Sequence, residues 1–192
     1  GTTSTIAALM DDHLFLGQVG DSRAYILRGD RLVQVTRDQS LVNQLIEAGQ
    51  LTEEEAETFE HNNIILQALG TADTVQVDLT YVVLKKGDTL LLCSDGLSGM
   101  VRNDEIREVL RSGAEPLEIC KVLTERANQA GGHDNITAII VCVLPGVPDT
   151  LASVFRFVSM LISDDLPTFG CPASQLMRPS ASMPSPAASA RR

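Results

Sequence analysis

Three short segments of this chain each place an aspartate beside small or polar residues, and each could contribute a carboxylate to a metal site. They are Gly20-Asp21-Ser22-Arg23, Ser94-Asp95-Gly96-Leu97-Ser98 and Gly131-Gly132-His133-Asp134-Asn135. A carboxylate at the end of a buried strand costs free energy unless a partner compensates its charge. Hard divalent cations prefer oxygen ligands, so three such aspartates meeting in one place would suit Mg²⁺ or Mn²⁺.

Each segment also has a plain structural explanation when it is taken alone. Asp-Gly and Asp-Asn pairs are common in turns, and Asp21 could simply form an ion pair with Arg23. A metal site is therefore indicated by the three segments together and in this order, since no one of them is specific.

The elements that must position these aspartates are predicted to be buried strands. Residues 14–19 precede Asp21, residues 90–93 precede Asp95, and residues 136–143 follow Asp134. A further strand covers residues 6–10, a hairpin joins residues 24–27 to 32–35 through Gly29-Asp30, and another strand covers residues 75–84. Each aspartate is thus expected where a strand meets a turn or a helix.

Helices are predicted in two places along the chain. The first pair lies within residues 40–59, where Thr52 and Glu55 form a capping box. The second pair starts near Asn103 and at Pro116, and Gly113 and Gly131-Gly132 end these two helices. Strands, then two helices, then a strand favour an α+β domain in which helices pack on sheets.

Charge and cysteine content narrow the classes of partner. The formal net charge of −10 argues against a nucleic-acid partner and suits a protein that gathers cations. The four cysteines form no Cys-x-x-Cys pair, which favours reduced thiols and a cytoplasmic protein over a zinc site or a disulfide framework. No stretch is apolar enough to predict a membrane span.

The motifs resemble successive motifs of the PPM-type (protein phosphatase 2C) serine/threonine phosphatases. The matching segments are the three above, with Gly1-Thr2-Thr3 before them; Thr36-Arg37-Asp38-Gln39-Ser40-Leu41 and Gln67-Ala68-Leu69-Gly70 resemble the bacterial branch. The resemblance covers Gly1 to about Val143. It implies an antiparallel β-sandwich flanked by helices, incomplete at the N-terminus.

The resemblance also implies the roles of the site residues. Asp95 and Asp134 would ligate a metal of a binuclear centre, and Asp21 would join Asp95 in holding a further, weaker ion. Ser94, Gly96 and Asn135 would orient these ligands. Two ions of Mn²⁺ or Mg²⁺, or three, would activate a water that attacks phosphorus, so no side chain need act as a nucleophile.

Departures from the family pattern limit this expectation. The acidic Asn-Glu-Asp-like segment, the Asp-Gly-x-Gly-Gly segment and the phosphate-binding Arg of the family are absent, and Asp38-Gln39 stands where bacterial members usually have Asp-His. We therefore expect residues 1–144 to be the C-terminal two-thirds of a phosphatase domain, with a flap insert at about 40–66. Such a fragment should bind metal weakly, turn over little or no phosphate, and leave sheet edges unpaired.

Residues 145–192 are rich in proline, serine and alanine and are predicted to form a tail. Apolar residues at helical spacing predict one short helix in it, over residues 151–162.

Hydrolysis of phosphoserine and phosphothreonine in proteins is the leading functional hypothesis. The partners would be phosphorylated proteins and a cognate serine/threonine kinase, with no nucleic acid and no membrane span, and the protein would be a monomer. One alternative is a catalytically inactive, phosphatase-like regulatory or binding module. Another is a regulatory phosphatase of the stress or sporulation type.

Overall fold

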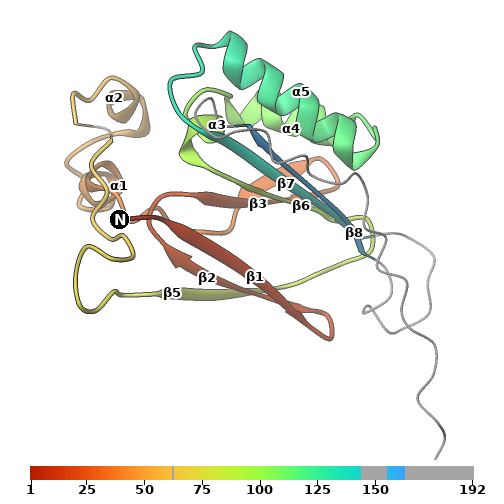
Figure 1. Ribbon diagram of the computed structural model, residues 1–192, viewed down its shortest axis with the longest axis horizontal. Coiled ribbons are helices and arrows are strands. Elements are labelled where there is room, and N and C mark those ends of the chain that lie inside the picture. The colour runs from red at the N-terminus through yellow and green to blue at the C-terminus, as the bar shows by residue number, and fades with distance from the viewer. Residues whose placement is uncertain (62, 144–154, 163–192) are drawn as a thin grey trace, which may run out of the picture.

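The computed structural model describes residues 1–61, 63–143 and 155–162 and contains two antiparallel sheets (Figure 1). The three-stranded sheet has the order β1-β2-β5, with bounds Ser4–Met10, His13–Val19 and Asp78–Val83. The five-stranded sheet has the order β4-β3-β6-β7-β8, with bounds Arg31–Gln34, Arg23–Arg28, Thr89–Cys93, Ile136–Val143 and Phe155–Ile162. The predicted α+β class is confirmed.

Strand β3 shows why the five-stranded sheet is the middle layer. Side chains alternate between the faces of a strand, and both faces of β3 are buried. Tyr25 and Leu27 belong to the core beneath the helices, whereas Ala24 and Ile26 belong to the core between the two sheets. A run of consecutive apolar residues is therefore needed here, in place of an apolar–polar alternation.

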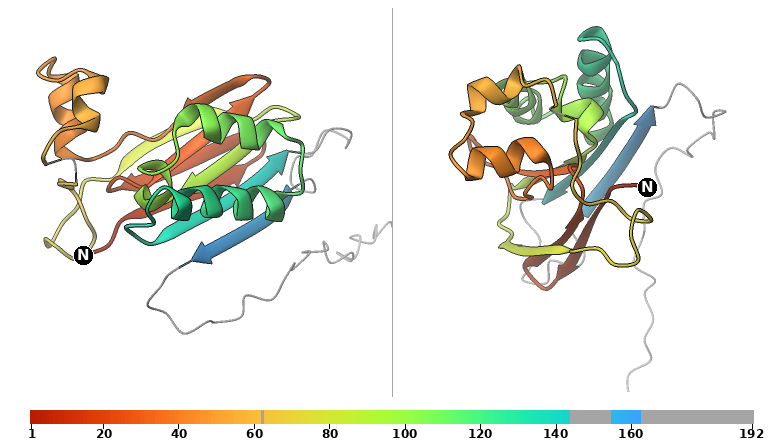
Figure 2. Two further views of the ribbon diagram at one scale, coloured as in Figure 1. Left: turned by 90° about the horizontal axis from the view of Figure 1, so that it is seen from above. Right: turned by 90° about the vertical axis from the view of Figure 1, so that its left-hand side faces the viewer.

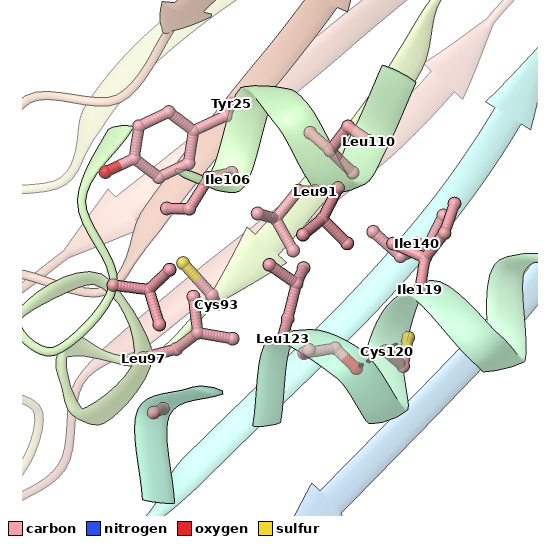
Figure 3. Packing of buried hydrophobic residues seen from close by; sticks show 14 of the residues in the cluster. Tyr25, Leu91, Cys93, Leu97, Ile106, Leu110, Ile119, Cys120, Leu123 and Ile140 are labelled. Carbon is pink, nitrogen blue, oxygen red and sulfur yellow. Dashed lines mark hydrogen bonds between the residues drawn. The ribbon is translucent and has the colours of Figure 1, made fainter. Parts of the chain in front are cut away.

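Helices α4 (Asn103–Arg111) and α5 (Pro116–Gln129) cover the outward face of the five-stranded sheet (Figures 1 and 2). Pro116 lies in the first turn of α5, where its missing N–H costs nothing. Leu123 of α5 and Ile106 of α4 are fully buried among Leu91, Cys93 and Ile140 of the sheet (Figure 3). This core fixes the strand ends that carry the aspartates.

The predicted insert contains two short helices, α1 (Leu41–Glu47) and α2 (Glu53–Glu57). The capping box at Thr52 is confirmed: the Thr52 hydroxyl accepts from the Glu55 N–H at 3.2 Å, and the Glu55 carboxylate accepts from the Thr52 N–H at 2.9 Å. The ends of segment 40–66 lie side by side, because Ser40 and Ile65 form a β-bridge and the Leu66 N–H donates to the Gln39 carbonyl at 2.7 Å.

The helix predicted over residues 151–162 is wrong for its second part. Residues 155–162 form β8, which pairs antiparallel with β7 from Ile136↔Ile162 to Val143↔Phe155, and residues 151–154 lie outside the described residues. The segment 155–162 is rich in aromatic and β-branched residues, which favour strands. The edge of β7 that does not pair with β6 supplies the hydrogen-bond partners for this strand. This is a tertiary effect that helical spacing in the sequence does not reveal.

Within the described residues, no helix combines the length and the apolar character that crossing a membrane requires.

Candidate metal centre

The three aspartates lie at one end of the five-stranded sheet because of strand register. Asp21 stands just before β3, Asp95 directly follows β6 in the short helix α3 (Asp95–Ser98), and Asp134 stands just before β7. The start of β3 is opposite the end of β6, since Arg23 pairs with Cys93, and the end of β6 lies opposite the start of β7, since Cys93 pairs with Ala138. Antiparallel pairing thus brings three distant segments to a common edge.

The charges of these carboxylates act on one another. Partial burial, and then the negative charge of Asp95, raise the pKa of Asp21 to about 6. Asp95 reaches solvent, yet the protein packed around it removes much of its hydration; this loss, followed by the charge of Asp134, raises the pKa of Asp95. Asp95 is therefore the central carboxylate. The negative charge of Asp134 acts on it, and its own negative charge acts on Asp21.

The donor chemistry fits a hard divalent cation, but the set is incomplete. Such an ion would stabilise carboxylates that lie close together and have no cation to neutralise their charge. However, the residues that the structure describes contain no group of three or more His, Cys, Asp or Glu side chains placed closely enough to hold a metal ion. Asp21, Asp95 and Asp134 share one edge, then, and do not by themselves enclose an ion.

Ser94 joins the loops that carry Asp95 and Asp134. Its hydroxyl donates to the Asn135 carbonyl oxygen at 2.8 Å and accepts from the Thr137 N–H at 2.9 Å. Asn135 takes part through its backbone, and its N–H donates to the Asp134 carboxylate at 2.6 Å. Ser94 and Asn135, two of the three predicted orienting residues, thus make distinct contacts. The third, Gly96, lies where the two loops approach closely.

Gly96 is required because the two loops touch. A Cβ at this position would lie 2.6 Å from the Asn135 carbonyl oxygen, and the atom in its way belongs to the backbone. The Gly96 N–H also donates to the Asp95 carboxylate at 2.9 Å, which directs that side chain. A glycine here lets the first turn of α3 pack directly on the entrance to β7.

Gln39 holds the loop of Asp21, a role that the sequence did not reveal. Its side-chain oxygen accepts from the Gly20 N–H at 2.8 Å, its own N–H donates to the Gly20 carbonyl at 2.9 Å, and its side-chain nitrogen donates to the Gln76 carbonyl at 3.1 Å. Gly20 has φ of 103°, and a Cβ there would collide with Thr3. In the sequence, Gln39 was marked as part of a segment that resembles the family, at a position where bacterial members usually have His.

The ion pair considered between Asp21 and Arg23 is not the one that forms. The Arg23 Nε–H donates to the Asp38 carboxylate at 2.8 Å, and Nη2 lies 2.7 Å from the same oxygen in an ion pair. Gln34 donates to the other oxygen of Asp38 at 2.8 Å. Because Asp38 engages Arg23, the carboxylate of Asp21 keeps its charge available for a cation.

Cys93 lies near the site but is not a nucleophile. Burial raises the pKa of its thiol to about 12, so the reactive thiolate is absent at neutral pH.

Replacing Gln39 with alanine should loosen the loop of Asp21. The buried Gly20 N–H would lose its acceptor, and we expect a loss of about 1–3 kcal/mol in the free energy of unfolding. Urea denaturation measures this change. Gln50→Ala, at an exposed position on the same insert, is the control; equal stability of the two variants would contradict the role of Gln39.

Comparison with known proteins bears on the same region of the chain. A family model described as Protein phosphatase 2C matches residues 1–133. Protein phosphatase PhpP of Streptococcus pneumoniae is 45% identical over 141 residues, which are 73% of this chain and 57% of that protein.

Solved structures agree with this match. The serine/threonine phosphatase of S. agalactiae superposes with a TM-score of 0.68 at 42% identity, over 71% of this chain and 56% of that one. The catalytic domain of the serine/threonine protein phosphatase PstP in complex with two manganese ions gives a TM-score of 0.64 at 38% identity, over 72% and 56%. The chain therefore spans little more than half the length of the relatives it matches.

Proposed function

Since this chain belongs to the protein phosphatase 2C family, we propose that it forms one side of a metal-dependent centre that hydrolyses phosphoserine and phosphothreonine in proteins. Family membership supports the reaction class, and the relatives carry names of serine/threonine phosphatases. Because the chain spans little more than half of their length, the activity belongs to the domain that this chain helps to form.

The observation that carries the proposal is the strand register that brings three aspartates to one edge of the sheet. The charge of Asp95 raises the pKa of Asp21, and that of Asp134 raises the pKa of Asp95, after the larger effect of burial in each case. Like charges are costly in such a place unless a cation binds there.

The chain's own residues would hold and orient Mn²⁺ or Mg²⁺. Asp95 and Asp134 would hold one ion, with Asp21 and Asp95 contributing to a weaker site, and the bound metal would supply Lewis-acid activation of water and neutralise phosphoryl charge. Ser94, Gly96 and Asn135 keep the two loops together, while Gln39 keeps the loop of Asp21 in place. No covalent phosphoenzyme is needed, in agreement with the buried thiol of Cys93.

The partners follow from this reaction. We propose that the domain acts as a monomer in the cytoplasm on phosphorylated proteins, among them the targets of a cognate serine/threonine kinase.

Metal removal tests the reaction class. The protein to assay is a chimera in which residues 1–143 replace the 141 matched residues of the S. pneumoniae phosphatase. Phosphate release from a phosphothreonine peptide should require Mn²⁺ or Mg²⁺, should stop in EDTA, and should return when the ion is added back. Undiminished hydrolysis in EDTA would show that the reaction does not use the proposed centre.

A further inference from the structure

A cleft of about 380 Å³ lies between the β3–β4 hairpin and helix α4. Its basic lining residues are Arg28 and Arg31 of the hairpin and Arg107 of α4. The volume is within the range of sites that hold small ligands, about 300–1,000 Å³. Because the whole chain carries a net charge of −10, a hollow where three arginines gather differs from the rest of the molecule. We call it the arginine cleft.

The arginine cleft and the three aspartates lie at opposite ends of β3. Arg28 is the last residue of this six-residue strand, whereas Asp21 stands just before its first residue. A strand rises about 3.3 Å per residue, so the two places are about 20 Å apart along the sheet. A group bound in the cleft is therefore not the group that the aspartates and their cation would act on.

Two of the three lining arginines are held by carboxylates. Arg28 donates from Nε and Nη2 to the two oxygens of the buried Asp88, at 2.9 and 2.7 Å. Arg107 forms an ion pair with Asp104, one turn before it in α4, at 3.1 Å. These pairs fix the two guanidinium groups at the wall of the cleft and leave some of their five N–H donors available.

Arg31 supplies the charge that is not balanced. It is exposed, and it makes no ion pair or side-chain hydrogen bond with any residue that the structure describes. The neighbouring carboxylate of Asp30 is engaged elsewhere, since it pairs with Arg111 at 2.9 Å. The arginine cleft thus keeps one positive charge for a ligand, together with the free donors of the other two arginines.

The first turn of α4 adds backbone donors to the same cleft. Asn103 and Asp104, the first two residues of this nine-residue helix, line it. The N-cap residue is Arg102, whose side chain has no acceptor atom and caps none of the N–H groups that follow. These N–H groups and the positive end of the helix dipole favour an anion.

We propose that the arginine cleft binds the phosphate of a second phosphorylated residue of the protein substrate, while the first is hydrolysed at the metal centre. This inference rests on the proposed function, because it takes the ligand from the same class of substrate. Arginine forks match pairs of phosphate oxygens, and clusters of arginine recognise phosphorylated segments. Leu32 adds an apolar wall for the carbon atoms of the phosphorylated side chain.

Two other anions fit the cleft less well. A carboxylate carries one charge and two oxygens, whereas a phosphate monoester carries about −1.5 to −2 at neutral pH and three acceptor oxygens. A nucleic acid would place further phosphates against the remaining surface of a chain whose net charge is −10.

Binding is measured first without the metal centre. The ¹⁵N-labelled 192-residue chain in EDTA is titrated with a peptide that carries one phosphothreonine. The backbone amide signals of Arg31, Asn103 and Arg107 should shift with one midpoint. The signal of Asn135, beside the aspartates, should stay in place. Arg31→Ala should raise the midpoint at least about tenfold, the effect of losing a hydrogen bond to a charged group. Lys121→Ala removes the same charge from α5 outside the cleft and should leave the midpoint unchanged.

Hydrolysis by the chimeric domain then tests the second contact. The substrate carries a phosphothreonine at each end of a Gly-Ser linker of about 15 residues, whose mean span of about 20 Å matches the distance along the sheet. Its kcat/KM should exceed that of a singly phosphorylated peptide of equal length at least about fivefold, because the linker raises the effective concentration of one phosphate. Two equivalent targets alone give a factor of about two. Arg31→Ala should reduce the advantage to that factor, and Lys121→Ala should preserve it.

Four results would overturn the inference. The cleft signals could fail to shift in EDTA, or Arg31→Ala could leave their midpoint unchanged. Inorganic phosphate with the same midpoint as the peptide would assign the cleft to free phosphate. A substrate with glutamate in place of one phosphothreonine that keeps the full advantage would assign it to acidic segments. Peptide binding in the cleft without Mn²⁺-dependent hydrolysis would instead contradict the proposed function and leave the cleft as a phosphate site.

Discussion

Asp95→Asn should abolish Mn²⁺-dependent phosphopeptide hydrolysis by the chimeric domain. Asp95 is the carboxylate that couples to both of the others, so its loss removes the group common to both proposed ion sites. Changes in residues that merely support metal ligands cost 10–100-fold in metal affinity or activity, so loss of a direct ligand should cost more than about 100-fold. The amide keeps the size of the side chain, which separates loss of charge from loss of packing.

The melting temperature provides a second readout of Asp95→Asn, and it should increase where hydrolysis is lost. The folded state raises the pKa of Asp95, so its ionised form opposes folding at neutral pH in the absence of metal. Asp95→Asn should therefore raise the melting temperature of the metal-free chain while removing any increase that Mn²⁺ produces. Asp104→Asn, at a carboxylate of 82% exposure outside the site, is the control and should leave hydrolysis and the Mn²⁺ effect unchanged. An active Asp95→Asn enzyme would contradict the metal centre.

Gly96→Ala should damage the site without touching a charge. The new methyl group would lie 2.6 Å from the Asn135 carbonyl oxygen, and that oxygen is held by the Ser94 hydroxyl. The loops must separate to admit it, so we expect a loss of about 1–3 kcal/mol in the free energy of unfolding. The Asp95 and Asp134 side chains would move apart, and hydrolysis should fall at least tenfold at fixed Mn²⁺.

Gly17→Ala is the matched control for this variant. A Cβ at Gly17 would meet Leu79 at 3.6 Å and Val77 at 3.8 Å, which are ordinary contacts, and no positive φ is required there. Urea denaturation and phosphate release should show Gly17→Ala near the parent protein and Gly96→Ala well below it. If the two variants behave alike, the close contact of the loops does not hold the site.

Local signals in the sequence predicted where the aspartates stand. Each of the three follows or precedes a strongly apolar strand, and the capping box at Thr52 is a fixed spacing of two residue types. These features depend on residues that are neighbours in the chain. In the structure, the aspartates stand next to strands and the capping box forms, as expected. Strand register then brings the three aspartates to one edge of the sheet. The sequence supported this convergence through its resemblance to the phosphatase family.

Contacts between distant segments could not be predicted in this way. Gln39 binds Gly20 and Asp38 binds Arg23 across the fold, and nothing in a local pattern marks either pair. Residues 155–162 have helical spacing yet complete a sheet, because the edge of β7 decides their conformation. Strand β2 has apolar residues on both faces, so the sequence could not indicate that Leu14 and Leu16 are the ones that enter the core between the sheets.

Paramagnetic broadening by Mn²⁺ tests most directly whether the three segments converge on a cation. In the ¹⁵N-labelled chimeric domain, substoichiometric Mn²⁺ should weaken the backbone amide signals of Ser22, Gly96 and Asn135 together, with one common midpoint. Signals of the exposed acidic residues Asp11 and Asp104 should weaken only at higher concentration. Separate midpoints for the three segments, or earlier broadening at Asp11 or Asp104, would contradict a shared metal centre.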